Sequence, residues 1–281
     1  MDKGGGFVHE MMEGTGELKS LSLFVGTGNC NANCVHCAGK IHRKYAPKED
    51  GIIDEDLIRK TVRECYIKGA RSLSISSSGE PTLSPLSVTK ALKLIHDLRN
   101  EGVNYSRINL YSNGIVIGKD KNFCDKYLGL WKSLGLTTIY LTIHDTDEKN
   151  NASVYGIVDY PPLTKIISKI HDSGLKVRGN TVLSKKLISN LDEFVEMIKK
   201  LEVLKVDYIS AWPIRNENDE VDAEMAPSKE ELSKISAWIE KDNHYGFEVK
   251  LLGDETHALY GENKKLTLFP DNTLSNSWCN H

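Results

Sequence analysis

A repeated unit of strand, polar turn, helix and glycine constrains the fold of this chain more than any other feature. Four helical stretches end at Gly69, Gly102, Gly135 and Gly174, at a spacing of roughly 33 residues. Glycine suits the left-handed conformation that ends a helix and turns the chain into the next strand. Strands and helices that alternate in this way form βαβ units and a parallel sheet. The sequence therefore predicts an α/β fold, a partial (β/α)6 TIM-type barrel with a short C-terminal extension.

Short apolar and β-branched runs give the predicted strands and the domain limits. Residues 1–20 are expected to be a flexible lead-in, 21–241 the partial barrel, and 242–281 an extension that caps one end of the barrel. The predicted strands are 21–25, 72–77, 107–111, 138–143, 176–183 and 206–213, with helices at 191–204 and 228–241. In barrels of this kind the loops at the carboxyl ends of the strands carry the function.

Charge and cysteine usage limit the class of protein. The net charge is −3 and the pI is near 6.3, so no overall basic surface indicates nucleic acid, which is neither implied nor excluded. Cys65, Cys124 and Cys279 stand alone in the sequence, unlike the cysteines of a secreted disulfide framework. No apolar run approaches the ~18 residues of a membrane span. A cytoplasmic protein without a membrane partner is expected.

Three cysteines lie within eight residues directly after the first predicted strand. Cys30, Cys34 and Cys37 have the spacing C-x3-C-x2-C. A [4Fe–4S] cluster is held by four thiolates, so three cysteines leave one iron open to a substrate or cofactor. Two alternatives remain for this loop. The first is a zinc site with His36 or a distant residue as fourth ligand, and the second is a group of reactive thiols.

This loop resembles the cluster-binding motif of the radical S-adenosylmethionine (radical SAM) superfamily. That motif has the same spacing and usually an aromatic residue just before the third cysteine, a position that His36 occupies here. The second strand ends in a Gly79-Glu80-Pro81 sequence, similar to the Gly-Glu-Pro motif of the superfamily. By itself this sequence also suits an ordinary helix entry. The resemblance covers about residues 20–216. It implies a [4Fe–4S] cluster held by Cys30, Cys34 and Cys37, with SAM as the second cofactor.

The resemblance also implies SAM contacts at the ends of the later strands. The third strand ends in Ser112 and Asn113, similar to a Thr-Asn-Gly ending in the superfamily, although an Asn-Gly turn needs no function. The fifth strand and the Asn190 that follows it, together with the proline at the end of the sixth strand, resemble the molybdenum-cofactor-synthase-like branch. The implied SAM-binding residues are Ser78, Gly79, Glu80, Ser112, Asn113, Thr142, Arg178, Asn180, Pro213 and Ile214.

Three residues are candidates for contact with the substrate or for catalysis. His144 follows the fourth strand, and Arg215 follows the sixth. Cys279 lies in a tail that looks like the start of a C-terminal module that holds auxiliary clusters in some relatives, but it is the only cysteine there and no second cluster is predicted. A solvated histidine, a solvated arginine and an uninvolved thiol are the ordinary alternatives.

The resemblance implies an enzyme that cleaves SAM reductively to a 5′-deoxyadenosyl radical and abstracts hydrogen from a substrate. Its expected partners are an electron donor such as ferredoxin or flavodoxin and a substrate that is a small molecule, a peptide or an RNA. The loop 145–160 or the tail is predicted to close the site. A glycyl-radical activase and a tRNA- or peptide-modifying enzyme are alternatives within the superfamily. A zinc-stabilised binding protein is the alternative without catalysis.

Overall fold

The computed structural model describes residues 18–34, 36–216, 220–241, 248–251 and 264–276. In this part of the chain nine strands form one sheet, in the order β7-β6-β5-β4-β3-β2-β1-β8-β9. The strands are β1 (Ser20–Phe24), β2 (Ser72–Ser76), β3 (Arg107–Ser112), β4 (Thr138–Thr142), β5 (Lys176–Leu183), β6 (Tyr208–Pro213), β7 (Glu248–Leu251), β8 (Lys265–Leu268) and β9 (Leu274–Ser275). The six predicted strands are present, each within two residues of its expected ends.

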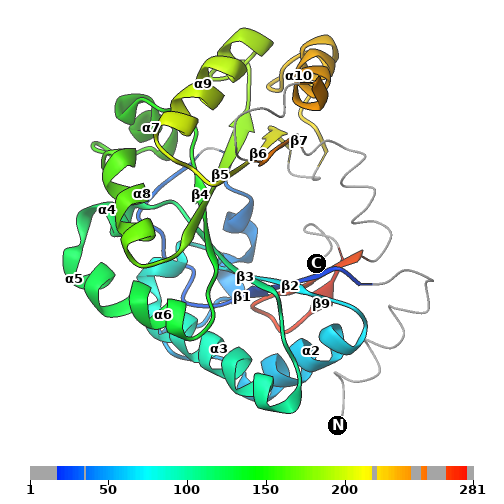
Figure 1. The fold of residues 1–281 in the computed structure, drawn as a ribbon. Helices are drawn as coiled ribbons and strands as arrows, with labels where there is room; N and C mark the ends of the chain where they lie inside the picture. The colour runs from blue at the N-terminus through cyan, green and yellow to red at the C-terminus, as the bar shows by residue number, and fades with distance from the viewer. Residues whose placement is uncertain (1–17, 35, 217–219, 242–247, 252–263, 277–281) are drawn as a thin grey trace.

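Helices follow the strands and lie in an arc along the outer face of the curved sheet (Figure 1). The main helices are α2 (Glu55–Ile67), α3 (Pro85–Asp97), α4 (Ile115–Lys119), α5 (Lys121–Phe123), α6 (Gly129–Ser133), α7 (Glu148–Tyr155), α8 (Leu163–Asp172), α9 (Leu191–Val203) and α10 (Lys229–Lys241). Shorter 3-10 or π-helical segments are η1 (Ala38–Tyr45), η2 (Pro81–Leu83), η3 (Leu98–Glu101) and η4 (Cys124–Leu128). Sheet and helices together form an open, partial barrel.

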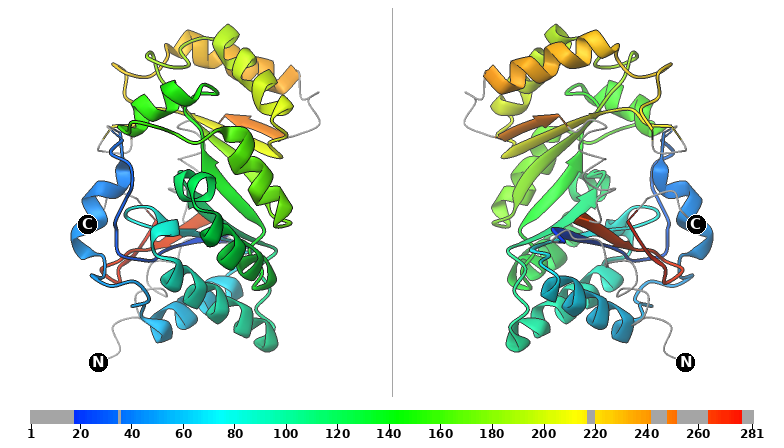
Figure 2. Two further views of the ribbon diagram at one scale, coloured as in Figure 1. Left: turned by 90° about the vertical axis from the view of Figure 1, so that its left-hand side faces the viewer. Right: turned by 90° about the vertical axis from the view of Figure 1, so that its right-hand side faces the viewer.

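Both edges of the sheet are extended by residues beyond 241. Strand β7 pairs in parallel with β6, and β8 pairs in parallel with β1, while β9 is antiparallel to β8. Figure 2 shows β8 in red beside the blue β1. The strands of this segment extend the sheet, and the cap on one end of the barrel by residues 242–281 stays a prediction. Unpaired strand edges offer free backbone donors and acceptors, and β7 and β8 pair with these groups at the edges of β6 and β1.

The two faces of the sheet differ in polarity. Side chains such as Leu73, Ile139 and Val177 are fully buried, and they alternate along their strands with polar side chains that face the opposite side. The register aligns Tyr140 with Arg178 across β4 and β5. Helices cover the apolar face, as expected of parallel strands, so the inner face of the partial barrel is polar.

The predicted helix ends are confirmed, because Gly69, Gly102, Gly135 and Gly174 all have φ between +74° and +107°. The prediction that residues 145–160 form a loop is wrong, while closure of the site by this segment stays a prediction. The segment 145–160 contains α7, which begins after Asp147, whose side chain accepts hydrogen bonds from two backbone N–H groups of the first turn. This capping satisfies donors that a helix start leaves free.

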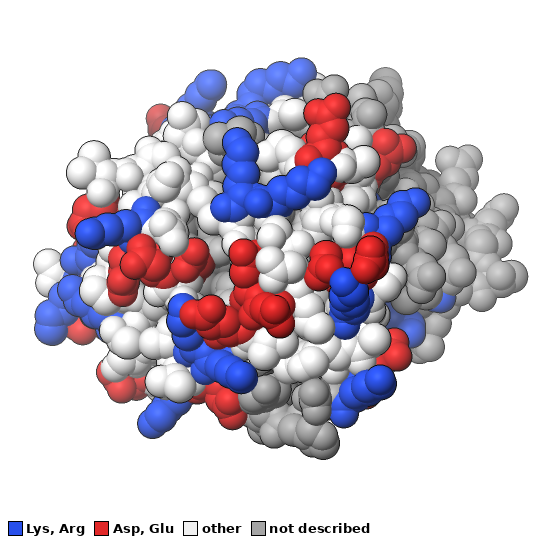
Figure 3. All heavy atoms as spheres, turned by 90° about the horizontal axis from the view of Figure 1, so that it is seen from above, with Lys and Arg blue, Asp and Glu red and all other residues white. Residues whose placement is uncertain are grey.

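No helix in the described ranges is both long and apolar enough to cross a membrane. On the face shown in Figure 3, basic and acidic side chains lie next to one another, so neither sign dominates. This agrees with the small net charge of −3.

Candidate iron–sulfur and SAM site

The loop that carries the cysteines (residues 26–37, the cluster loop) packs directly against the turn after β2. A Cβ added at Gly79 would lie 2.1 Å from the backbone oxygen of Asn29 and 2.3 Å from that of Gly28. The backbone N–H of Glu80 donates to the Asn29 oxygen at 2.8 Å. A residue with a Cβ would clash at this position, so glycine lets the cluster loop approach the backbone of the turn.

Glu80 is almost fully buried and connects the ends of β2 and β3. Its Oε1 accepts hydrogen bonds from the Thr82 backbone N–H at 3.1 Å, the Thr82 hydroxyl at 2.7 Å and the Ser112 hydroxyl at 2.8 Å. Its Oε2 accepts one from the Asn113 backbone N–H at 2.7 Å. Burial raises the pKa of Glu80, and these hydrogen bonds oppose that rise. Among the described residues Oε2 has one donor, so it retains a lone pair for another.

Asn113 joins Glu80 to the cluster loop. Its backbone N–H binds Glu80, and its side-chain Nδ2 donates to Asn31 Oδ1 at 2.7 Å. The same Nδ2 lies 4.0 Å from Cys30 Sγ. A single residue at the end of β3 therefore contacts both the first cysteine and the carboxylate of the Gly-Glu-Pro sequence.

Cys30, Cys34 and Cys37 are free, half-buried thiols. Burial, together with the neighbouring Cys37 and Cys30, raises the pKa of Cys34 to about 12. Burial also raises the pKa of Cys30, with a contribution from Glu80. In the part of the chain that the structure describes, no three His, Cys, Asp or Glu side chains are arranged to hold a metal ion. The three thiols nevertheless lie close enough to affect one another electrostatically, and binding of a metal would release their protons.

Strands β4 and β5 bring Thr142, Arg178 and Asn180 to the inner face. The Arg178 guanidinium lies over the Tyr140 ring at 4.0 Å, and its Nε donates to Asn180 Oδ1 at 3.0 Å. Asn180 is fully buried, and its Nδ2 has no partner in the structure. The backbone oxygen of Thr142 accepts the Tyr155 hydroxyl at 2.9 Å. Asn180 therefore offers a donor that the described protein groups leave unused.

The residues at the end of β6 pack separately from Arg178 and Asn180. Ile214 belongs to a small apolar cluster with Val182 and Ala226, separate from the main core. Arg215 forms an isolated antiparallel bridge with Val221. Pro213 is buried at the last position of β6. Cys279 lies outside the described residues.

His144 is buried beside the cluster loop, with 1 % of its surface exposed. Its ring makes edge-to-face contacts with His36, at 5.0 Å between centroids, and with Tyr155, at 4.8 Å. Tyr155 in turn stacks on Tyr160 at 5.1 Å. A row of aromatic rings therefore runs from the cluster loop to α7 and beyond it.

One family model matches a range that contains both the cysteine loop and most of the strand–helix repeat. The family model described as the radical SAM superfamily matches residues 24–201, which is more than half of the 281 residues. The chain belongs to the radical SAM superfamily. It is an enzyme, and its cofactors are a [4Fe–4S] cluster and SAM.

Curated relatives of this radical SAM enzyme include GTP 3′,8-cyclases. The protein of Campylobacter jejuni (strain RM1221) is 26 % identical over 192 residues, which are 65 % of this chain and 54 % of that protein. The protein of Haemophilus influenzae (strain PittEE) is 23 % identical over 175 residues, 61 % of this chain and 47 % of that protein. The chain spans about half the length of these relatives, which agree with the predicted branch of the superfamily.

Solved structures share the fold. Streptococcus suis SuiB bound to S-adenosylmethionine matches with a TM-score of 0.66 and 15 % identity, over 97 % of this chain and 63 % of that chain. The protein anSMEcpe with bound AdoMet matches with a TM-score of 0.60 and 13 % identity, over 92 % of this chain and 74 % of that chain. These likenesses concern the fold, and they confirm the predicted partial barrel.

The residues present in the radical SAM site fit the two cofactors. Three thiols of one loop supply soft ligands for iron, one fewer than a [4Fe–4S] cluster takes. Glu80 Oε2 has room for a further donor, and Ser78 Oγ and Asn180 Nδ2 are buried without a partner in the structure. A charged, polar ligand such as SAM can satisfy such atoms, which would otherwise be costly to bury.

The sequence analysis missed Asn31, Arg43 and Tyr155. Arg43 Nε donates to the backbone oxygen of Ser78 at 3.0 Å, and so ties η1 to the turn after β2. The Tyr155 backbone oxygen accepts the Asn33 N–H at 2.7 Å, which ties α7 to the cluster loop. No local pattern marks these residues, since each acts through a partner distant in sequence.

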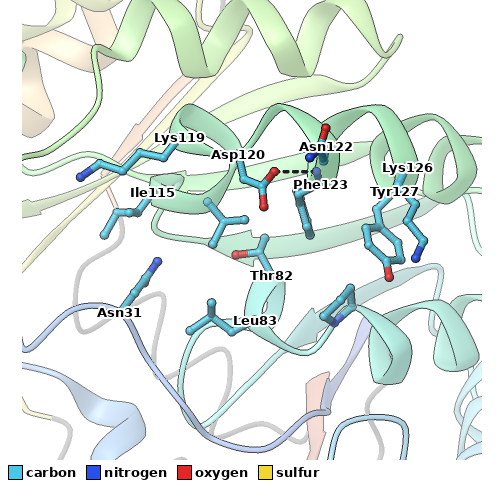
Figure 4. A pocket seen from close by; sticks show the side chains of 12 residues that line it. Asn31, Thr82, Leu83, Ile115, Lys119, Asp120, Asn122, Phe123, Lys126 and Tyr127 are labelled. Atoms are coloured by element: carbon cyan, nitrogen blue, oxygen red, sulfur yellow. Dashed lines mark hydrogen bonds between the residues drawn. The ribbon is translucent and has the colours of Figure 1, made fainter.

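An open pocket of about 530 Å³ lies between η2 and the helices after β3 (Figure 4). Asn31 reaches it from the cluster loop, while Leu83, Ile115, Phe123 and Tyr127 line it elsewhere. None of the three cysteines is among its lining residues. This pocket is therefore distinct from the inner face where Arg178 and Asn180 lie.

Proposed function

We propose that this radical SAM enzyme cleaves SAM reductively and uses the resulting 5′-deoxyadenosyl radical to abstract hydrogen from a substrate on the inner face of the partial barrel. One observation carries the proposal, which is that Asn113 contacts Cys30 Sγ and Glu80 Oε2 at once. The cluster ligand and the carboxylate are therefore neighbours, as a cofactor that binds to both requires. When bound, the cluster supplies one electron to the sulfonium of SAM.

The protein groups bind and orient the cofactor in this proposal. Cys30, Cys34 and Cys37 hold the cluster as thiolates. Glu80 accepts a hydrogen bond from the methionyl ammonium through the free lone pair of Oε2, and Asn180 Nδ2 donates to a polar oxygen of SAM. Thr82, Ser112 and Asn113 fix the orientation of the Glu80 carboxylate, because together they make four hydrogen bonds to it.

The other predicted SAM contacts are assigned from their positions on the strands and at the strand ends. Arg178 is held over the Tyr140 ring, and we assign it to a carboxylate or ribose oxygen of SAM. Thr142, Pro213 and Ile214 complete the strand ends that would surround the nucleoside. Arg215 and Cys279 stay candidates for substrate contact. The polar inner face favours a polar substrate.

Iron content and SAM cleavage test the proposal. Protein purified without oxygen should be brown and contain close to four irons per chain, and dithionite with SAM should yield 5′-deoxyadenosine. Cys34→Ala should abolish both. The matched control is Cys124→Ala, because Cys124 lies outside the cluster loop, with its Sγ bonded to the Ile117 oxygen. Colourless protein with one zinc, or parental cleavage by Cys34→Ala, would refute the assignment.

Transfer of deuterium from a labelled compound to 5′-deoxyadenosine identifies the substrate. GTP is the first compound to assay, because the curated relatives are GTP 3′,8-cyclases by name. A substrate deuterated at the reacting carbon should transfer its label to 5′-deoxyadenosine. Peptides and RNA are the next classes, and a glycyl radical formed on a second protein would identify an activase. An electron donor such as flavodoxin or ferredoxin should replace dithionite.

A further inference from the structure

His144 is the most conspicuous buried polar side chain near the cluster loop. It follows β4, and its backbone N–H donates to Asn151 Oδ1 at 3.0 Å. Both of its ring nitrogens are buried and have no hydrogen-bond partner in the structure. A buried polar group without a partner costs about 1–3 kcal/mol. By contrast, His171 on α8 has its Nε2 2.9 Å from an Asp207 carboxylate oxygen.

The polar groups around His144 are already engaged with other partners. Asn151 Oδ1 accepts the backbone N–H groups of His144 and Asp145, and Asn151 Nδ2 donates to the Asp145 oxygen. The Tyr155 hydroxyl donates to the Thr142 oxygen. The imidazole is therefore packed and held in place, but the described residues supply no acceptor for its N–H.

Both aromatic neighbours of His144 are connected to the cluster loop. His36 directly precedes Cys37 in sequence and packs edge-on to the His144 ring at 83°. Tyr155 is bonded to the loop through the Asn33 backbone N–H. The sulfur atoms of an iron–sulfur cluster accept hydrogen bonds, and such bonds help to set its reduction potential.

We propose that His144 is a positioning residue that donates one imidazole N–H to a sulfur atom of the bound [4Fe–4S] cluster and thereby raises its reduction potential. The inference rests on the proposed function, since it needs the cluster. It places His144 against the cluster, whereas its position at a strand end alone suggested contact with the substrate. The hydrogen bond offsets negative charge that accumulates on the cluster when it is reduced.

Redox titration of the cluster tests this role. His144→Phe keeps an aromatic ring against Tyr155 but removes the donor. At a fixed potential we expect the ratio of reduced to oxidised cluster to fall about tenfold, equivalent to a midpoint lower by ~59 mV for one electron. His144→Gln, which keeps an N–H, should recover part of the shift. The control is His171→Phe, which changes a histidine on the outer helix α8 and should keep the parental midpoint potential. A parental midpoint for His144→Phe would overturn the proposal.

Pulsed electron paramagnetic resonance gives a second test, which uses the parent protein. With ¹⁵N-histidine incorporated and SAM omitted, the reduced cluster should show coupling to a histidine nitrogen. The coupling should persist in His36→Phe and disappear in His144→Gln or His144→Phe, whichever retains iron. Absence of coupling in the parent, or its loss only in His36→Phe, would overturn the assignment.

The outcomes separate this inference from the proposed function. Protein without iron, or iron-loaded protein that does not cleave SAM, would contradict the proposed function. A cluster that cleaves SAM but shows neither histidine coupling nor a shift in potential would contradict the role of His144 alone.

Discussion

Gly79→Ala is expected to displace the cluster loop, because the new Cβ would meet two backbone oxygens. The distances of 2.1 Å to Asn29 and 2.3 Å to Gly28 are well below van der Waals contact, and neither oxygen belongs to a flexible side chain. Overpacking of this kind costs about 1–3 kcal/mol. Movement of the loop also breaks the hydrogen bond from the Glu80 N–H to Asn29, worth ~1 kcal/mol. The expected total is about 2–4 kcal/mol.

Calorimetry and iron analysis measure the effect of Gly79→Ala. At ~2–4 °C per kcal/mol for a large domain, Tm should fall by about 4–16 °C, and iron content should fall well below four per chain. Gly129→Ala is the matched control. A Cβ at Gly129 meets nothing within 4 Å, and alanine favours the helix by ~1 kcal/mol, so this variant should keep its iron and have a Tm that is unchanged or higher by up to about 4 °C. A Gly79→Ala protein with parental Tm and iron would refute the packing argument.

Three further predictions concern the same region. Glu80→Gln presents an amide NH2 to donors that now bind a carboxylate, so it should lose about 1.5–3 kcal/mol in chemical denaturation and bind SAM at least ~10-fold more weakly by titration calorimetry. Tyr155→Phe removes the hydrogen bond to the Thr142 oxygen, and should cost ~1 kcal/mol while iron content is unchanged. Burial lowers the pKa of His144 from 6.5 to about 3, so the folded protein binds fewer protons than the unfolded chain between these values. The free energy of unfolding of the cluster-free protein should therefore fall as pH falls from 6.5 toward 3, and His144→Phe should flatten that slope; equal slopes would contradict the burial argument.

Local patterns were sufficient to predict most of the elements. The spacing of Gly69, Gly102, Gly135 and Gly174 marked four helix ends, and all four adopt the left-handed conformation. A helix cap depends on the backbone angles of one residue, so a single sequence contains the information. The six strands were found for a similar reason, since apolar runs between turn residues are local features.

The sequence did not predict features that depend on contacts with distant residues. Strands β7 and β8 lie at opposite edges of the sheet, beside β6 and β1, although they are close in sequence. Their partners depend on which edges the earlier strands leave free. Helix α7 was missed because its eight residues carry little apolar periodicity, and it is stabilised by the Asp147 cap and by the contact of Tyr155 with the cluster loop.

The sequence by itself determined the order of strands and helices, the family and the cysteine loop, because each depends on residues near one another in the chain. Only the tertiary structure decided that Gly79 is needed for packing against the cluster loop, that Glu80 is held by Thr82, Ser112 and Asn113, and that His144 lies against His36. Such contacts arise when neighbouring parallel strands end at one edge of a sheet, and their register and the packing of the loops select which side chains meet.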